Sequence, residues 1–272
     1  MKWSTMSRRK LFNLMDNTTQ KLPANKQFCV DVMSAIERKN VLEHRKGSPW
    51  YKPSSLHCLR RMYFTRIGAD EDVSNTDYKS IGMADTGTRR HEAIQDILLD
   101  MTRLGYDWEY VDVAEYVEMK QKQGKCLTLV VKERVGAETK LFDNSLKISF
   151  RCDGIIKRIS TGEYFLFEFK NVASFKFSTL EDEILEQHHN QVICYCTALD
   201  LDKAFVTYED RNMCELKVPE IFEVTTEMKS DLTNRLFECE GYVERLIPAP
   251  KEESSHNCRW CPYRSACRKV GD

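Results

Sequence analysis

Several features are missing from this sequence of 272 residues, and each absence excludes a class of protein. No apolar run approaches the roughly 20 residues of a membrane-spanning helix, so we expect no membrane partner. The first 20 residues are basic but lack the apolar segment of a secretory signal, which predicts an intracellular, cytoplasmic protein. The formal net charge is only −1, so nucleic-acid binding would need a local basic groove.

Internal repeats and low-complexity tracts are also missing, and the remaining pattern predicts a mixed α/β domain. Residues 1–50 look helical and break at KGSPWYKP, which predicts a helical N-terminal extension or cap over 1–50 and a main domain over 51–272. Within the main domain we predict helices over 53–68, 84–105, 180–201 and 226–246, and strands over 108–119, 125–135, 146–159, 163–172, 203–210 and 214–222.

Two neighbouring predicted strands bring two carboxylates and a lysine together. In YFLFEFKN, three phenylalanines line one face, so Glu168 and Lys170 share the other face of a strand that is covered on both sides. The turn STG pairs this strand with the one that carries Asp153, which predicts that the three side chains meet. Two carboxylates suit Mg²⁺ or Mn²⁺, and the lysine can orient or deprotonate an attacking water. The alternative is an internal ion pair, because many unrelated hairpins match D-x14-E-x-K.

Two predicted helices carry further candidates. His91 lies on an apolar stripe and points inward, where it is either a hydrogen-bonded core residue or a ligand whose Nε2 completes the metal shell. On the later helix, His188, Gln191 and Tyr195 share one face. That face is either a polar strip at the surface or a strip that touches phosphate or positions Lys170.

Eleven cysteines are many for a reducing compartment, where clustered thiols more often bind metal than form disulfides. Cys258, Cys261 and Cys267 follow the spacing C-x2-C-x5-C, one ligand short of the four that zinc or iron–sulfur sites require. Seven others show no ligand spacing, and we expect them to be small buried hydrophobic residues: Cys29, Cys126, Cys152, Cys194, Cys196, Cys214 and Cys239.

The order of these segments resembles a nuclease family. PSSLHCLRRMYF, GTRRHEAI, RCDGII, FEFK, QVICY and CRWCPYRSAC follow one another over about residues 52 to 269, as in the RecB-like branch of the PD-(D/E)xK nucleases. The chain more closely resembles the iron–sulfur members, such as CRISPR-associated iron–sulfur exonucleases and AddB-type nuclease domains. The resemblance implies a restriction-endonuclease-like α/β fold, with a mixed central sheet flanked by helices and a Cys-rich iron–sulfur region at the C-terminus. Residues 1–50 are outside it.

The resemblance also implies roles for individual residues. Lys170 would be the catalytic lysine, and Gln191 and Tyr195 match a Q-x3-Y motif beside the site. The ligands of Mg²⁺ or Mn²⁺ would be His91, Asp153, Glu168 and the main-chain carbonyl of Phe169. Asp153 and Glu168 would thereby also be catalytic.

The missing fourth cysteine ligand is also supplied by the resemblance. Cys58 would join Cys258, Cys261 and Cys267 around a [4Fe–4S] cluster, although Leu59 stands where the family frequently has proline. Such a cluster would clamp the first helix of the domain to its C-terminal tail, so that metal-binding energy becomes folding energy. Zinc is the rival, but a tight zinc site usually has two C-x2-C knuckles.

The implied function is metal-dependent hydrolysis of DNA by an exonuclease that acts on single-stranded ends, in recombination, repair or phage DNA processing. The expected location is the bacterial or phage-infected host cytoplasm. GxxxxGK[ST] is absent, so a helicase or recombination protein would be a partner. The alternatives are a DNA-binding or assembly subunit, for example in CRISPR adaptation, and a zinc-stabilised interaction protein. Five basic residues are candidates either to hold the DNA backbone or to be solvated surface charges: Arg60, Arg61, Arg89, Arg90 and Lys176. Tyr63, Phe64 and Trp260 are candidates to stack on bases, although packing around the cluster is the favoured role for Trp260.

Overall fold

Two units make up the chain in the computed structural model, which describes residues 22–43, 48–72, 76–125, 128–135, 138–252, 258–259 and 261–271. One unit comprises 1–44 with 75–81, and the other comprises 45–74 with 82–272. The first unit holds helix α2 (Ala24–Leu42), as the sequence predicts, and the start of helix α4 (Tyr78–Asp100). None of the α2 residues is buried, and Glu37 accepts a hydrogen bond from the Tyr78 main-chain N–H at 3.2 Å.

The second unit is built on a mixed six-stranded sheet in the order β1-β5-β6-β7-β8, with β9 also paired to β7. Strands β6 and β7 are parallel, and every other pair in this sheet is antiparallel. The strands are β1 (Trp108–Val111), β5 (Gly154–Arg158), β6 (Tyr164–Val172), β7 (Lys203–Asp210), β8 (Leu216–Lys217) and β9 (Phe222–Glu223). The expected hairpin over 146–172 is thus present as β5 and β6.

A smaller antiparallel sheet has the order β2-β3-β4. Its strands are β2 (Thr128–Val135), β3 (Glu138–Asp143) and β4 (Ile148–Phe150). The helices of the second unit, besides α4, are η1 (Pro53–Ser55), α3 (Leu59–Arg66), α5 (Val113–Lys122), α6 (Ser174–Phe177), α7 (Glu186–Leu199), α8 (Thr226–Glu244) and α10 (Arg264–Val270). The chain is therefore mixed α/β, with a mixed central sheet flanked by helices.

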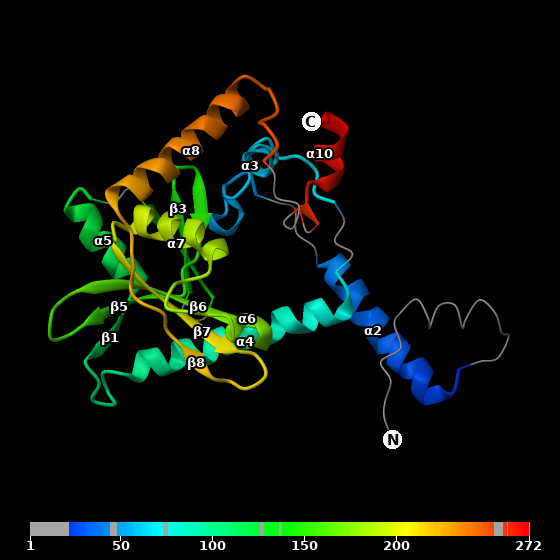
Figure 1. Cartoon of the computed structure of the whole chain (residues 1–272), viewed down its shortest axis with the longest axis horizontal. Coiled ribbons are helices and arrows are strands. Elements are labelled where there is room, and N and C mark those ends of the chain that lie inside the picture. The colour runs from blue at the N-terminus through cyan, green and yellow to red at the C-terminus, as the bar shows by residue number, and fades with distance from the viewer. Residues whose placement is uncertain are drawn as a thin grey trace. The chain divides into compact units, whose positions relative to one another are not determined.

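Period-two alternation along β6 separates two cores, one on each face of the main sheet. Phe165, Phe167 and Phe169 pack with Ile94 and Leu98 of helix α4. The opposite face belongs to a larger core that includes the buried side of α7 and part of α8. Figure 1 shows α4 on one side of this sheet and α7 on the other. The expectation that this strand is covered on both faces is confirmed.

Three predicted elements are interrupted where one residue departs from the required backbone. The helix over 53–68 is split into η1 and α3, because Cys58 is extended (φ −143°, ψ 115°). The strand over 108–119 ends at Val111, because Asp112 accepts hydrogen bonds from two main-chain N–H groups of α5 and so caps a helix. The strand over 146–159 divides into β4 and β5, with Asp153 at the end of the break.

Helix boundaries also differ from the prediction. Helix α4 begins at Tyr78 rather than near Asp85, and Asp77 accepts the main-chain N–H of Ser80 at its start. Thr86 lies inside the helix, where its hydroxyl donates to the Gly82 carbonyl at 2.9 Å. Helix α7 begins at 186 rather than 180, because Leu185 is extended (φ −62°, ψ 131°). Helix α8 matches its predicted range closely.

The cysteines outside the C-x2-C-x5-C spacing divide into two groups. Cys152, Cys194, Cys196 and Cys239 are buried, as expected of small hydrophobic residues. Cys29 and Cys214 are exposed, so the expectation is wrong for these two, and Cys126 lies outside the described residues. In the described part of the chain, no helix is both long and apolar enough to cross a membrane.

Candidate active site

The candidate site lies where strand β5 begins and its partner β6 runs on. Pairing of β5 with β6 starts at Gly154, opposite Phe167, whereas β6 continues to pair with β7 beyond this point. Here Oδ2 of Asp153 accepts a hydrogen bond from the main-chain N–H of Phe169 at 2.6 Å. The Asp153 carboxylate therefore accepts the Phe169 main-chain N–H, just beyond the point where the pairing of β5 with β6 begins. This places the carboxylate next to Glu168.

A hydrogen-bonded network joins the lysine to the two residues of the Q-x3-Y segment. Lys170 Nζ donates to Oε1 of Glu168 at 2.6 Å and to Oε1 of Gln191 at 3.1 Å. Gln191 Nε2 in turn donates to Oε1 of Glu168 at 2.8 Å and to the Tyr195 hydroxyl at 2.9 Å. The amide of Gln191 thus orients both Lys170 and Glu168, and the structure brings together these four side chains from β6 and α7.

Glu168 is the most strongly perturbed group of the site. Its side chain is 2% exposed, and burial, with the charge of Asp153, raises its pKa to about 7 against the opposing charge of Lys170. All of its hydrogen bonds reach Oε1, while Oε2 is buried and has no hydrogen-bond partner among the described residues. A buried polar atom without a partner costs about 1–3 kcal/mol. Oε2 is therefore the position in this site that lacks a cation or a donor.

His91 reaches the same place from helix α4. Its Nδ1 lies 3.2 Å from Oδ1 of Asp153, and its ring meets Phe169 edge-on with centroids 5.0 Å apart. Burial alone would lower the pKa of His91, but the hydrogen bond to Asp153 and its charge outweigh this and raise it. His91 therefore faces the carboxylate, as one reading of the sequence required, although through Nδ1 rather than Nε2.

Two residues that the sequence analysis missed hold the main chain of Asp153. Gln95 Nε2 donates to its carbonyl at 2.7 Å, and the Tyr110 hydroxyl donates to the same oxygen at 3.2 Å. The Tyr110 ring also fills the space beside Gly154, where an added Cβ would lie 2.5 Å from Cε2 of the ring. His91 and Gln95 are four residues apart on one face of α4, and this spacing could have identified Gln95.

A cavity of about 390 Å³ connects these groups, which is within the size range of ligand pockets. Its wall contains seven side chains described above that carry titratable or amide groups, together with five other residues: Ala84, Gly87, Thr88, Glu92 and Arg151. Glu92 is exposed and also lines the cavity. No sequence pattern singles out Arg151. As they stand, no three His, Cys, Asp or Glu side chains in the described ranges form a group that could hold a metal ion.

The four cysteines of the implied cluster are all half-buried and lie in the second unit. Burial raises the pKa of the Cys261 thiol, and the nearby charges of Cys58 and Cys267 contribute in the same direction. The Cys261 main-chain N–H donates to the Cys258 carbonyl at 3.4 Å. The structure therefore brings the start of α3 close to the C-terminal segment, without assembling the thiols into a completed ligand group.

Hydrogen bonds already join α3 to the C-terminal segment. Arg60 is buried; its Nε donates to the Ala249 carbonyl at 2.8 Å and its Nη1 to the Gly271 carbonyl at 2.6 Å. Glu252 accepts the main-chain N–H of Leu59 at 2.7 Å, and the main-chain N–H of Asp72 donates to the Pro262 carbonyl at 2.6 Å. Ordinary hydrogen bonds therefore already clamp the two segments that the implied cluster was expected to join.

Several residues expected to contact DNA are used elsewhere. Arg60 already donates to main-chain carbonyls of the C-terminal segment, and Arg90 on α4 pairs with the buried carboxylate of Glu209. Tyr63 and Phe64 are each 5% exposed, so neither can stack on a base. These expectations are wrong, because tertiary packing satisfied the side chains first. Arg89 is exposed and Arg61 half-buried, Lys176 donates to Gln187 at 3.3 Å, and Trp260 lies outside the described residues.

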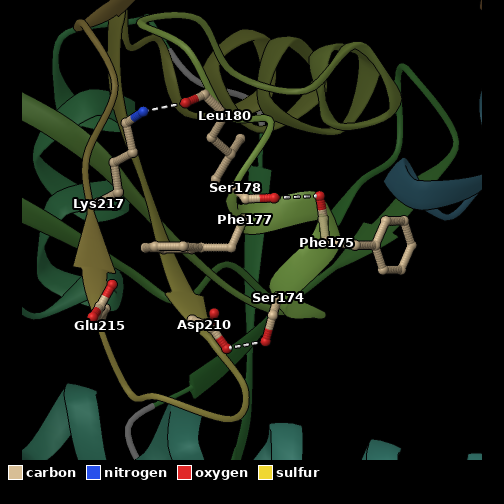
Figure 2. A pocket seen from close by; sticks show the side chains of 8 residues that line it. All are labelled: Ser174, Phe175, Phe177, Ser178, Leu180, Asp210, Glu215 and Lys217. Atoms are coloured by element: carbon tan, nitrogen blue, oxygen red, sulfur yellow. Dashed lines mark hydrogen bonds between the residues drawn. The ribbon is translucent and has the colours of Figure 1, made fainter.

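A second hollow, of about 610 Å³, lies between α6 and strands β7 and β8. Figure 2 shows Phe177 lying across it, while the ring of Phe175 points away. The hydrogen bonds drawn there run from Ser174 to Asp210, from Ser178 to the Phe175 carbonyl and from Lys217 to the Leu180 carbonyl. Much of its polar lining is thus already satisfied, and it contains none of the candidate catalytic residues.

Comparison with known proteins does not assign a family. No protein-family model and no curated protein sequence matches the chain. Among solved structures, the crystal structure of SSO0001 is 15% identical and aligns over 89% of this chain and 98% of that chain, with a TM-score of 0.45. The chain has a mixed central sheet flanked by helices.

Proposed function

We propose that this chain is a metal-dependent DNA nuclease of the RecB-like PD-(D/E)xK type, acting on single-stranded ends, with a structural [4Fe–4S] cluster. The observation that carries the proposal is the environment of Glu168. Its Oε1 accepts hydrogen bonds from Lys170 and Gln191, while Oε2 is buried and has no hydrogen-bond partner among the described residues. An internal ion pair alone leaves that oxygen unsatisfied, whereas a cation held by Asp153 and Glu168 would satisfy it.

The donor set suits Mg²⁺ or Mn²⁺, which prefer carboxylate oxygens. Asp153 and Glu168 would hold the ion, with His91 and the Phe169 carbonyl as further donors at the same end of β6. When bound, the ion supplies Lewis-acid activation of water and neutralises charge that develops on a phosphate. The pKa of Glu168, raised to about 7, means that a proton competes with this cation below neutral pH.

Side chains of this protein would then position the groups that give and take protons. Lys170 is held between two acceptors, so its Nζ is placed beside the carboxylates rather than free in solvent. An ammonium there stabilises negative charge on a phosphate oxygen, and the amine form can take a proton from an attacking water. Gln191 fixes the lysine and is fixed in turn by the Tyr195 hydroxyl. Burial and the charge of Glu168 raise the pKa of Tyr195 well above its usual range, which keeps that hydroxyl protonated.

The cysteines fit a structural cluster at the other end of the second unit. The four thiols are half-buried and lie at the start of α3 and in the C-terminal segment, and Nη1 of Arg60 lies 3.9 Å from Sγ of Cys267. A nearby guanidinium favours thiolates, the form that binds iron or zinc. Cys58, Cys258, Cys261 and Cys267 would hold the [4Fe–4S] cluster, which supplies folding energy rather than catalysis.

The experiment is a DNase assay with end-labelled single-stranded, duplex and circular DNA in Mn²⁺, with and without EDTA. Wild type should release label from single-stranded ends only when metal is present, and Lys170→Ala should lose at least about 100-fold in rate. Lys157→Ala is the matched control, because this strand β5 lysine pairs with the exposed Glu109. Equal activity of wild type and Lys170→Ala would contradict the proposal. Binding of DNA without cleavage would favour the DNA-binding or assembly subunit instead.

A further inference from the structure

One cationic side chain in the cavity of the proposed nuclease site has no hydrogen-bond or ion-pair partner among the described residues. Arg151 lies in the break between β4 and β5, two residues before Asp153, and lines the cavity with Lys170, Gln191 and Tyr195. Its Nε is buried and has no hydrogen-bond partner among the described residues. Guanidinium N–H groups can only donate, so this atom needs an acceptor that the described part of the chain does not supply.

The other cations of the cavity wall differ from Arg151 in this respect. The Lys170 ammonium contacts Glu168 and Gln191, and the His91 ring contacts Asp153. Arg90, on the same helix as His91, is neutralised by Glu209 outside the cavity. Arg151 is half-buried, yet no described carboxylate is paired with it. Its charge is therefore available to a bound molecule.

From this arrangement, which rests on the proposed nuclease function, we propose that Arg151 is the phosphate-binding residue of the site. Its guanidinium group binds one phosphate of the DNA strand. Lys170 and the carboxylates act on a different phosphate, the one that is cleaved. Planar guanidinium groups bind phosphate oxygens through charge-assisted, often paired, hydrogen bonds, and an exposed lysine would not have the same fixed geometry. A nucleic-acid backbone supplies the anion that both Arg151 and the metal site require.

The test is binding of a short single-stranded DNA in Ca²⁺ without Mg²⁺ or Mn²⁺, with Arg151→Gln and Arg151→Lys compared with wild type. Arg151→Gln should weaken Kd about ten- to a hundredfold. It should also reduce the slope of log Kd against log salt by about 0.7, the loss of one phosphate contact on a single strand. Arg151→Lys should keep the slope but lose part of the affinity. Arg158→Gln, which removes a surface arginine of β5 paired with Asp107, is the matched control.

A single methylphosphonate linkage, moved along the strand one position at a time, identifies the phosphate. At one position it should weaken binding by wild type and have no further effect on Arg151→Gln, because the contact is already lost. Additive losses at every position, or an unchanged salt slope, would overturn the proposal. So would loss of the cooperative unfolding transition in both Arg151 variants, since the guanidinium would then be a structural group.

These outcomes are separable from failure of the proposed function. A wild-type protein that neither binds nor cuts DNA contradicts the nuclease assignment, and the role of Arg151 falls with it. A wild-type protein that binds and cuts, with Arg151→Gln unchanged, contradicts only the phosphate contact. Arg151-dependent binding without cleavage in Mn²⁺ supports the phosphate contact and contradicts the proposed catalysis.

Discussion

Gln95 and Asp153 are joined by a buried hydrogen bond, in which the side-chain Nε2 of Gln95 donates to the Asp153 main-chain carbonyl at 2.7 Å. Gln95 is 3% exposed, and His91, one turn earlier on α4, contacts the carboxylate of the same aspartate. One helix therefore holds both the backbone and the side chain of Asp153. This arrangement fixes the direction of the carboxylate at the point where β5 starts.

We expect Gln95→Met to weaken Mn²⁺ binding about 10- to 100-fold, because groups that orient metal ligands have effects of this size. The free energy of unfolding should fall by about 1–3 kcal/mol, since the Asp153 carbonyl loses a buried donor. Two titrations with Mn²⁺ measure this effect. One gives the Mn²⁺ concentration at half-maximal activity, and the other gives the Mn²⁺ concentration at which Tm has risen by half of its maximal increase. Gln27→Met, at an exposed position of α2, is the control. A loss of stability with an unchanged Mn²⁺ midpoint would show that Gln95 is only structural.

Gly154→Ala should destabilise the protein by about 1–3 kcal/mol, because the new methyl group meets the Tyr110 ring at 2.5 Å. Removing the ring in Tyr110→Ala should relieve that clash, so the double variant should lose less than the sum of the two single variants. Chemical denaturation measures all four proteins. Gly82→Ala is the control, because Gly82 lies in α4 and no atom is within 4 Å of a Cβ added there. We expect this variant to gain about 1 kcal/mol in free energy of unfolding. Additive losses in the cycle would contradict the contact.

The contribution of Glu168 to stability without metal should fall as the pH rises from about 4.5 to 7. Burial and the charge of Asp153 raise the folded pKa of Glu168 to about 7, so the native state binds the extra proton in that window. Stabilisation by this group is complete below the unfolded pKa and is lost as the pH passes the folded pKa. Mn²⁺ should therefore raise Tm more at pH 8 than at pH 6, where a proton competes with it.

Glu168→Gln provides the check on this pH dependence. The amide mimics the protonated carboxyl, so the variant without metal should lack the part of the pH dependence of Tm between 4.5 and 7 that comes from Glu168, and its Tm should rise relative to that of wild type as the pH rises. It should also lose most of the Mn²⁺-dependent rise in Tm. Calorimetry at pH 6 and pH 8, in EDTA and in Mn²⁺, gives both results. An equal response to Mn²⁺ in wild type and Glu168→Gln would remove Glu168 from the ligand set.

His188 should give the opposite pH dependence at lower pH. Its side chain is 8% exposed, and burial, with the charge of Lys170, lowers its pKa to about 3. The unfolded state then binds the extra proton between about 3 and 6.5, so stability is complete above 6.5 and is lost as the pH falls. The loss is at most about 1.4 kcal/mol per pH unit for one proton.

Urea titrations from pH 7 to pH 4 measure the free energy of unfolding of wild type and His188→Leu. The variant should lack the decrease in this free energy that protonation of His188 causes at low pH. Tyr208→Phe removes the hydroxyl that lies 2.8 Å from Nδ1 of His188 but keeps the histidine buried. We expect this variant to retain the wild-type pH slope, because burial is the main cause of the shift. The same slope in wild type and His188→Leu would show that another group is responsible.

Cys58→Ala should lose the proposed cluster and destabilise the protein, although Cys258, Cys261 and Cys267 remain. A cluster needs four ligands, and Cys58 is the cysteine that joins α3 to the C-terminal segment. Iron content and absorbance near 400 nm in anaerobic samples measure the cluster, and zinc content tests the rival metal. Cys29→Ala, at an exposed position of α2, should change neither. Full iron content in Cys58→Ala would show that the fourth ligand is another residue.

Much of the candidate site follows from local pattern. The alternation of YFLFEFKN placed Glu168 and Lys170 on one face, and the turn after β5 placed Asp153 across from them. Gln191 and Tyr195 follow from helical spacing on α7, and the structure joins both to the same network. These inferences needed only the period of an element and the register of a short hairpin, which local sequence determines.

Other site features depend on contacts between distant segments. Arg60 and Arg90 look like surface cations in the sequence, but one binds main-chain carbonyls of the C-terminal segment and the other binds Glu209. Gln95 and Tyr110 gain their roles only because α4 and β1 pack against the residue before Gly154. Arg151 stands out only because its Nε has no hydrogen-bond partner among the described residues.

The sequence by itself determined the mixed α/β class, the hairpin of β5 and β6, and the shared face of Glu168 and Lys170, because these depend on side-chain period and turn residues. Only the tertiary structure decided where the strands break, which arginines are already paired and which oxygen of Glu168 lacks a partner. Those properties depend on which groups satisfy one another's hydrogen bonds and charges across the fold, and no local window of sequence contains both partners.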